Sequence, residues 1–141
     1  METNNTTTSN GVHNAHAKDN AAKIIFGDPV LCAQFLKGYT DIPLFKEIKP
    51  EDIENVSSHF LPLFQESRDS DTVNKIRIGN SEIYLIALIE HQSENDFDMS
   101  FRILRYIVFI WTDYAVQQEK LHKGITKSKA FLYPPILPIV Y

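Results

Sequence analysis

The chain has 141 residues and a mass of 16.2 kDa, which suits one domain with a single hydrophobic core. Its 14 Lys and Arg against 18 Asp and Glu give a formal net charge of −4, which excludes a nucleic-acid module coated throughout in positive charge. The one cysteine, Cys32, excludes an internal disulfide. The polar N-terminal segment lacks the features of a secretory signal, and no apolar run is long enough to span a membrane. We expect a soluble, cytoplasmic protein.

The chain divides into a polar tail and one domain. Residues 1–17 are mostly Asn, Thr, Ser, Gly and His, with almost nothing to bury, so this segment is predicted to be disordered. The domain is predicted to occupy residues 18–141.

Three helices are expected in the first part of the domain. A short helix over residues 21–26 is stopped by Gly27, a residue typical of helix C-termini. Asp28 and Pro29 then form the N-cap and first turn of a second helix, which ends at Gly38. A third helix is expected to run from Pro50 to Phe60.

The middle of the chain predicts a β-hairpin. Residues 72–78 and 83–89 are rich in β-branched side chains, and Gly79-Asn80-Ser81 lies between them. A long helix follows from Met99 to Lys123, and its first half is apolar on most sides, so we expect it to be buried. Residues 136–141 predict a final strand. The sequence of elements indicates an α/β fold.

An acidic residue lies at the same end of each strand of the predicted hairpin: Asp71 precedes the first strand, and Glu90 follows the second. A two-residue loop at Asn80-Ser81 would place Asp71 directly opposite Glu90. Gln92 would face the same side, because the side chains of a strand alternate.

A carboxylate pair on one face repels, and a sheet tolerates it when a proton or a divalent cation lies between the two groups. Two carboxylates that hold Mg²⁺ suit hydrolysis of a phosphodiester bond, with a polar side chain beside them to orient the attacking water. The alternative is that acids at strand ends are ordinary solvated groups.

Three basic residues are candidates for contact with DNA. Arg102 and Arg105 are three positions apart on the long helix and lie close together on its surface. They are either ordinary surface or ion-paired arginines, or residues that contact phosphate or fix the active-site acids. Lys75 would share the face of Asp71, where it either steers a phosphate or pairs with the acids.

Four segments resemble the bacterial recombination-promoting nucleases, the Rpn family, also named YhgA-like transposases. The similar segments are residues 71–73, residues 85–93 with the sequence LIALIEHQS, residues 99–106 with MSFRILRY, and residues 134–141 with PPILPIVY. The resemblance implies the PD-(D/E)XK nuclease core, a mixed sheet with a β-hairpin, flanked by helices. It also implies that Asp71 and Glu90 bind Mg²⁺ or another divalent cation, and that Gln92 replaces the lysine found in most of that superfamily.

The implied function is that of a metal-dependent DNA endonuclease that promotes recombination or transposition. Members of the family continue past the segment at residues 134–141, so we expect the chain to represent the N-terminal part of the domain. Two alternatives stay open: a catalytically inactive, truncated member that binds DNA or a partner, and a structural interaction domain. The oligomeric state, a homo-oligomer included, also stays open.

Overall fold

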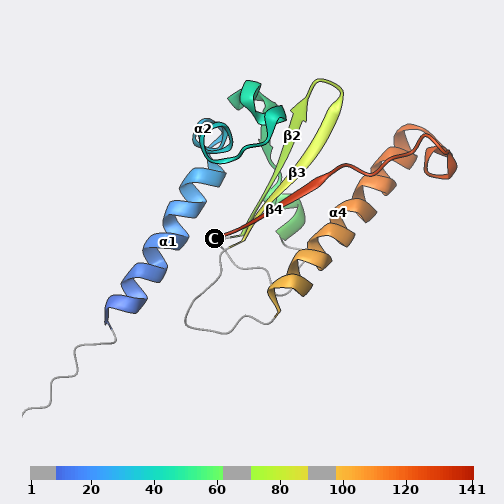
Figure 1. Cartoon of the computed structure of the whole chain (residues 1–141). Helices are drawn as coiled ribbons and strands as arrows, with labels where there is room; N and C mark the ends of the chain where they lie inside the picture. Colours follow the sequence, from blue (N-terminus) through green and yellow to red (C-terminus); the bar gives the residue numbers. More distant parts are fainter. Residues whose placement is uncertain (1–8, 62–70, 89–97) are drawn as a thin grey trace, which may run out of the picture.

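A four-stranded mixed sheet lies at the centre of the computed structural model, which describes residues 9–61, 71–88 and 98–141 (Figure 1). The strands lie side by side in chain order; the first three are antiparallel, and the fourth runs parallel to the third. Their bounds are β1 (Ile53–Asn55), β2 (Thr72–Ile78), β3 (Ser81–Leu88) and β4 (Ile136–Val140). Helices flank this sheet, so the predicted α/β fold class is confirmed, and the arrangement is compatible with a nuclease-like core.

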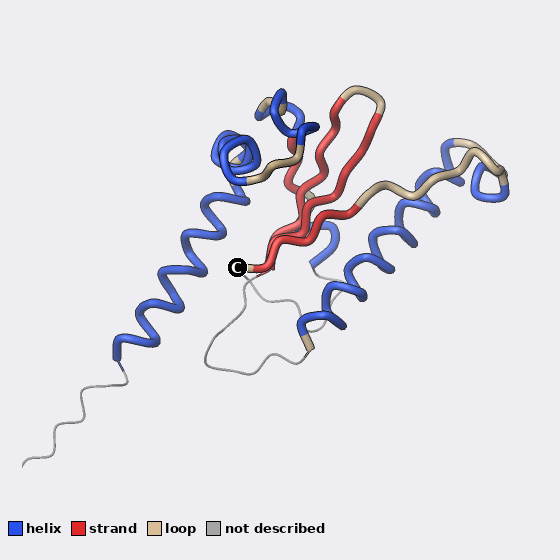
Figure 2. Tube along the Cα trace, viewed as in Figure 1, coloured by secondary structure: helices blue, strands red, loops and turns tan. Residues whose placement is uncertain are grey.

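The helices form a layer on each side of the sheet (Figure 2). One layer contains α1 (Ser9–Gly27) and α2 (Pro29–Tyr39), and the other contains α4 (Met99–Leu121). The remaining elements are single turns: η1 (Pro43–Glu47), η2 (Pro50–Asp52), α3 (Ser57–Phe60) and η4 (Ile125–Lys127). Within the described residues, no helix combines the length and the apolar character that crossing a membrane requires.

Alternation along β2 and β3 divides the core into two parts, because successive side chains of a strand point to opposite faces. The first core packs against α1, α2 and η1, and the second packs against α3 and α4. The buried members of the first are Phe26, Cys32, Ala33, Leu36, Phe45, Ile48, Ile53, Ile76, Ile83, Leu85 and Ala87. Those of the second are Phe60, Val73, Tyr84, Ile86, Leu88, Tyr106 and Ile110.

The junction of α1 and α2 follows the predicted capping chemistry. The Asp28 side chain accepts a hydrogen bond from the backbone N–H of Val30 at 2.8 Å, so it caps α2 as expected. The carbonyl of Phe26, near the end of α1, has no partner within its helix and accepts a hydrogen bond from Asn74 Nδ2 at 2.8 Å. This buried contact ties α1 to β2.

Two of the early elements differ from their predictions. The α1 helix begins at Ser9, where the sequence predicted a disordered tail through residue 17; Ala17, Ala21 and Ala22 are strong helix formers. The predicted helix over residues 50–60 is wrong. Residues Ile53–Asn55 instead form β1 and pair with β2, because the buried Ile53 gains a place opposite Ile76 in the first core.

The register of the hairpin also differs from its prediction. The turn residues are Gly79 and Asn80, and Ile78 pairs with Ser81. Gly79 has a φ of 60°, which glycine adopts without strain at the first position of a type II′ turn. The predicted loop at Asn80-Ser81 is therefore wrong by one residue on each strand. This shift of the pairing by two positions leaves every side chain on its predicted face, but it makes Leu88, and not Glu90 as predicted, the position opposite Asp71.

One face of α4 contradicts the prediction that its first half is buried. Arg102, Tyr106 and Ile110, each one turn apart, face the sheet and are buried. Phe101, Leu104 and Val108 lie on the other side of the helix and are 55%, 52% and 56% exposed. A single sheet face covers only one side of a helix, so the apolar residues on the outer side stay in contact with solvent.

We predict that Asn74→Ala lowers the free energy of unfolding by about 1–3 kcal/mol, because the buried carbonyl of Phe26 loses its donor. Urea denaturation followed by circular dichroism measures the loss. Gln34→Ala, at an exposed position of α2, is the control and should change stability by less than about 0.5 kcal/mol. Equal effects of the two substitutions would show that the Asn74 contact does not hold α1.

Candidate active site

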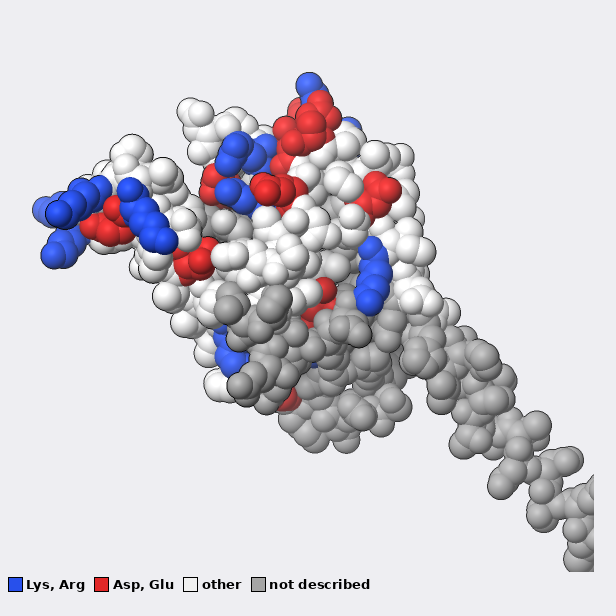
Figure 3. Space-filling view, turned by 180° about the vertical axis from the view of Figure 1, so that it is seen from behind, with Lys and Arg blue, Asp and Glu red and all other residues white. Residues whose placement is uncertain are grey.

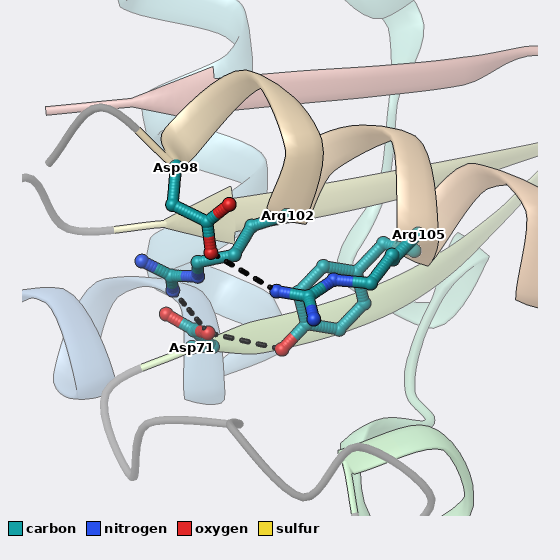
Figure 4. A network of polar contacts seen from close by, with 5 residues as sticks. Asp71, Asp98, Arg102 and Arg105 are labelled. Carbon is teal, nitrogen blue, oxygen red and sulfur yellow. Dashed lines mark hydrogen bonds and ion pairs between the residues drawn. The ribbon is translucent and has the colours of Figure 1, made fainter.

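Asp71 lies directly before β2 and is buried, although it carries a carboxylate; its side chain is 0% exposed. Its Oδ2 atom accepts hydrogen bonds from Arg102 Nη2 at 2.6 Å and from the Tyr106 hydroxyl at 2.9 Å. Figure 4 shows the guanidinium of Arg102 reaching down from α4 to the Asp71 carboxylate. A buried acid of this kind requires such partners, because taking a charge out of water is costly.

The helical repeat of α4 supplies both partners of Asp71. Arg102 and Tyr106 are four residues apart, so they lie one above the other on the side that faces the sheet. Sequence reasoning did not identify Tyr106 as part of the site and assigned it to packing. The four-residue spacing from Arg102 was the available signal, but the sequence did not show which side of the helix faces Asp71.

Arg105 lies at the border of this side and has different contacts. Three residues along a helix correspond to about 300° of rotation, so Arg105 lies about 60° from Arg102 around the helix axis. Arg102 faces the sheet, and Arg105 stays at the surface. Its Nη2 atom lies 3.2 Å from Asp98 Oδ2, and its guanidinium lies 5.0 Å from the centre of the Phe101 ring. Of the two roles expected for Arg102, the structure supports the fixing of an acid.

Tyr106 is held in its neutral, hydrogen-donating form. Burial raises the pKa of its hydroxyl well above the ordinary value of tyrosine, and the nearby negative charge of Asp71 raises that pKa further. A neutral hydroxyl donates its proton to the carboxylate, whereas a phenolate would repel it. The contact therefore persists throughout the neutral pH range.

The second oxygen of Asp71 differs from the first in its contacts. Oδ1 is buried and has no hydrogen-bond partner among the described residues, although a buried polar atom normally has one. Carboxylate oxygen is the ligand type that Mg²⁺ prefers, so Asp71 fits as one ligand of a divalent cation. The positive charge of Arg102 offsets the negative charge of Asp71, so a cation at this site requires further acidic ligands.

The sequence also predicted Glu90 as a second metal ligand and Gln92 as the residue that orients the water. Glu90 and Gln92 lie outside the described residues. Within the described ranges, no group of three or more His, Cys, Asp or Glu is arranged to hold a metal ion. The arrangement of Asp71 with the other two candidate site residues therefore stays a prediction.

Lys75 lies on the same face of β2 as Asp71, as expected, but it contacts a different acid. Its Nζ atom is 3.5 Å from Glu82 Oε1, near the turn of the hairpin. Four residues of strand separate it from Asp71, which corresponds to about 13 Å. Lys75 is therefore part of a surface ion pair at the opposite end of the hairpin.

We predict that Arg102→Met lowers the free energy of unfolding by about 3–5 kcal/mol, because it leaves the charge of Asp71 buried without its cation. The double variant Asp71→Asn/Arg102→Met should lose less than the sum of the single losses. Arg105→Met, which removes a partly exposed ion pair, is the matched control and should cost less than about 1 kcal/mol. Strictly additive losses in urea denaturation would contradict a direct Asp71–Arg102 interaction.

We also predict that Tyr106→Phe flattens the alkaline stability profile. The pKa of Tyr106 is raised in the folded state, whereas tyrosine in the unfolded chain has a pKa of about 10. Above pH 10 the unfolded chain releases this proton first, so the folded state loses stability as pH rises, by up to about 1.4 kcal/mol per pH unit. Urea denaturation at pH 8 and pH 11 should show a smaller decrease for Tyr106→Phe than for the unaltered protein. An equal decrease would mean that Tyr106 is not shielded from ionisation.

Comparison with known proteins identifies the family of the chain. The family model described as "Putative transposase, YhgA-like" matches residues 16–141, which include β1–β4, α4, Asp71, Arg102 and Tyr106. No curated protein and no solved structure shows a significant match. Because the family model extends over most of the chain, the protein belongs to the YhgA-like transposase family.

Proposed function

We propose that the protein is a metal-dependent DNA endonuclease that hydrolyses phosphodiester bonds during recombination or transposition. One observation carries the proposal: a buried aspartate at the start of a central strand has one oxygen fixed by Arg102 and Tyr106 and the other without a partner among the described residues. Membership of a transposase family supports DNA as the substrate.

Arg102 and Tyr106 act as positioning residues in this proposal. Both donate to Oδ2 of Asp71, so the carboxylate cannot rotate freely and Oδ1 keeps one direction. A ligand held in a fixed position avoids reorganisation when the reaction takes place. The two residues come from a helix and not from a loop, which makes their positions more exact.

Asp71 and Glu90 are the proposed ligands of Mg²⁺ or another divalent cation. Glu90 comes two residues after the end of β3, the strand that pairs with the one following Asp71. When bound, the cation would supply a Lewis acid that lowers the pKa of water and neutralises charge on the phosphate. Gln92 would accept and donate hydrogen bonds at the attacking water, which it would orient without adding charge.

A plasmid-nicking assay tests this function, with the purified chain in Mg²⁺, in Mn²⁺ or in EDTA. We expect nicking in the two metals and none in EDTA. Asp71→Asn and Glu90→Gln should each lower the rate at least 100-fold, because each removes a charged ligand at nearly constant shape. Asp41→Asn, at an exposed position in the loop after α2, is the control and should cut at the unaltered rate.

Three outcomes would overturn the proposal. Nicking that persists in EDTA would exclude a metal-dependent mechanism, and nicking that persists in both Asp71→Asn and Glu90→Gln would exclude this site. Circular dichroism of each variant separates loss of the site from loss of the fold. A folded chain that binds DNA but does not cut it in either metal would be the inactive binding module that the sequence left open.

A further inference from the structure

The far end of α4 carries a concentration of positive charge that the proposed active site does not use. Four lysines, all exposed, lie on the last turn of α4, on η4 and directly after them; we call this region the lysine tip. Its members are Lys120, Lys123, Lys127 and Lys129. Figure 3 shows Lys and Arg side chains gathered at this end of the molecule. The charge is local, because the chain as a whole has a net charge of −4.

Glu119, the acidic residue next to Lys120, is hydrogen-bonded to the turn that follows α4. Glu119 accepts hydrogen bonds from the backbone N–H groups of Gly124 and Thr126 and from the Thr126 hydroxyl. These hydrogen bonds lower the pKa of the Glu119 carboxyl, so it stays ionised and directed at the turn. Among the described residues, none of the four lysines forms a direct ion pair, and all four are exposed, although the charge of Lys127 also helps to lower the pKa of the Glu119 carboxyl.

Stabilisation of the helix explains only one of these four charges. Cations near a helix C-terminus interact favourably with the helix dipole, but the effect is limited to the last turn. Only Lys120 satisfies that condition, because α4 ends at Leu121. Lys123 follows the end of the helix, and Lys127 and Lys129 come after Gly124, whose φ of 86° turns the chain away, so the dipole does not account for these three.

Aromatic contacts hold the segment after the lysine tip against α4. Trp111 Nε1 donates a hydrogen bond to the carbonyl of Pro134 at 2.8 Å, and the Trp111 ring lies 5.2 Å from that of Tyr133. Phe131 lies 5.0 Å from Tyr133 and 6.0 Å from Tyr114, measured between ring centres. The turn that presents the lysines is therefore fixed at both ends, and less conformational entropy is lost when a partner binds.

We infer that the lysine tip binds the phosphate backbone of double-stranded DNA. A group of exposed ammonium groups on a fixed turn, none of them ion-paired with a described residue, is complementary to a regular line of phosphates. The choice of DNA among polyanions rests on the proposed function. About 18 residues of helix separate Arg102, beside the proposed active site, from Lys120, or roughly 27 Å along the axis, so a duplex that extended from the active site to the lysine tip would span about eight base pairs.

Fluorescence anisotropy of a labelled 24-base-pair duplex tests the inference in EDTA, where the proposed metal-dependent cleavage cannot occur. The test variant changes all four lysines of the tip to Gln. The matched control changes four exposed lysines on α1, α2 and η1 to Gln, and so has the same net charge: Lys18, Lys23, Lys37 and Lys46. We expect the tip variant to bind the duplex at least tenfold more weakly than the unaltered chain at 100 mM salt, and the control variant to bind it nearly as tightly as the unaltered chain. For the tip variant, the slope of log affinity against log salt should fall by about 3–4, roughly one for each lost phosphate contact.

Equal weakening in the two variants would overturn the inference, because it would show an effect of net charge and not of the lysine tip. Vesicles of phosphatidylglycerol and phosphatidylcholine form a second arm, since Leu132 next to the tip is 78% exposed. Loss of vesicle binding without loss of DNA binding in the tip variant would also overturn it. Nicking by the unaltered chain is scored separately, so failure of the nuclease proposal and failure of the lysine tip give different results.

Discussion

The burial of the Asp71 carboxylate determines how the two halves of the second core meet. Asp71 comes from the start of β2, and both of its partners come from α4, so their hydrogen bonds fix the helix against the sheet. The pair has side-chain exposures of 6% and 0%, and neither group has water to replace a lost partner. Val73, Tyr84, Ile86 and Ile110 supply the apolar packing around this contact, but apolar packing has no direction. The directed hydrogen bonds fix the position of α4 along the sheet.

The same contact gives the site its chemical character. A carboxylate with both oxygens bound to the protein would be purely structural, and one with both oxygens in water would be an ordinary surface acid. Asp71 is in neither state, because Oδ2 is bound twice and Oδ1 is buried without a partner among the described residues. The structural role and the proposed ligand role are thus divided between two atoms of one residue. This division explains how a charged site can also contribute to the stability of the domain.

The two ends of α4 have different tasks in this view. Its N-terminal turns face Asp71, while the lysine tip begins at its last turn and continues into η4. The outer side between them exposes Phe101, Leu104 and Val108. Long helices of this kind convert a short sequence separation into a fixed spatial one, which loops cannot do.

The sequence by itself determined the local elements and the composition of the faces. The Asp28 cap, the alternation of β2 and β3 and the extent of α4 all depend on contacts within a few residues, and all follow their predictions closely. Glycine chemistry, read correctly, would also have placed the turn at Gly79-Asn80. The motif residues Asp71 and Arg102 were identified as candidates, although the contact between them was only one of several options.

Only the tertiary structure decided the features that depend on long-range pairing. Ile53–Asn55 had a helical pattern, and β1 formed because β2 offered an open edge and a buried place for Ile53. The sequence showed an apolar helix over residues 99–123, but not which of its sides the sheet would cover. The partnership of Asp71 with Tyr106 spans 35 positions and depends on the rotation of α4 about its axis. That rotation is fixed by packing of the whole helix against the second core, so no local pattern could predict it.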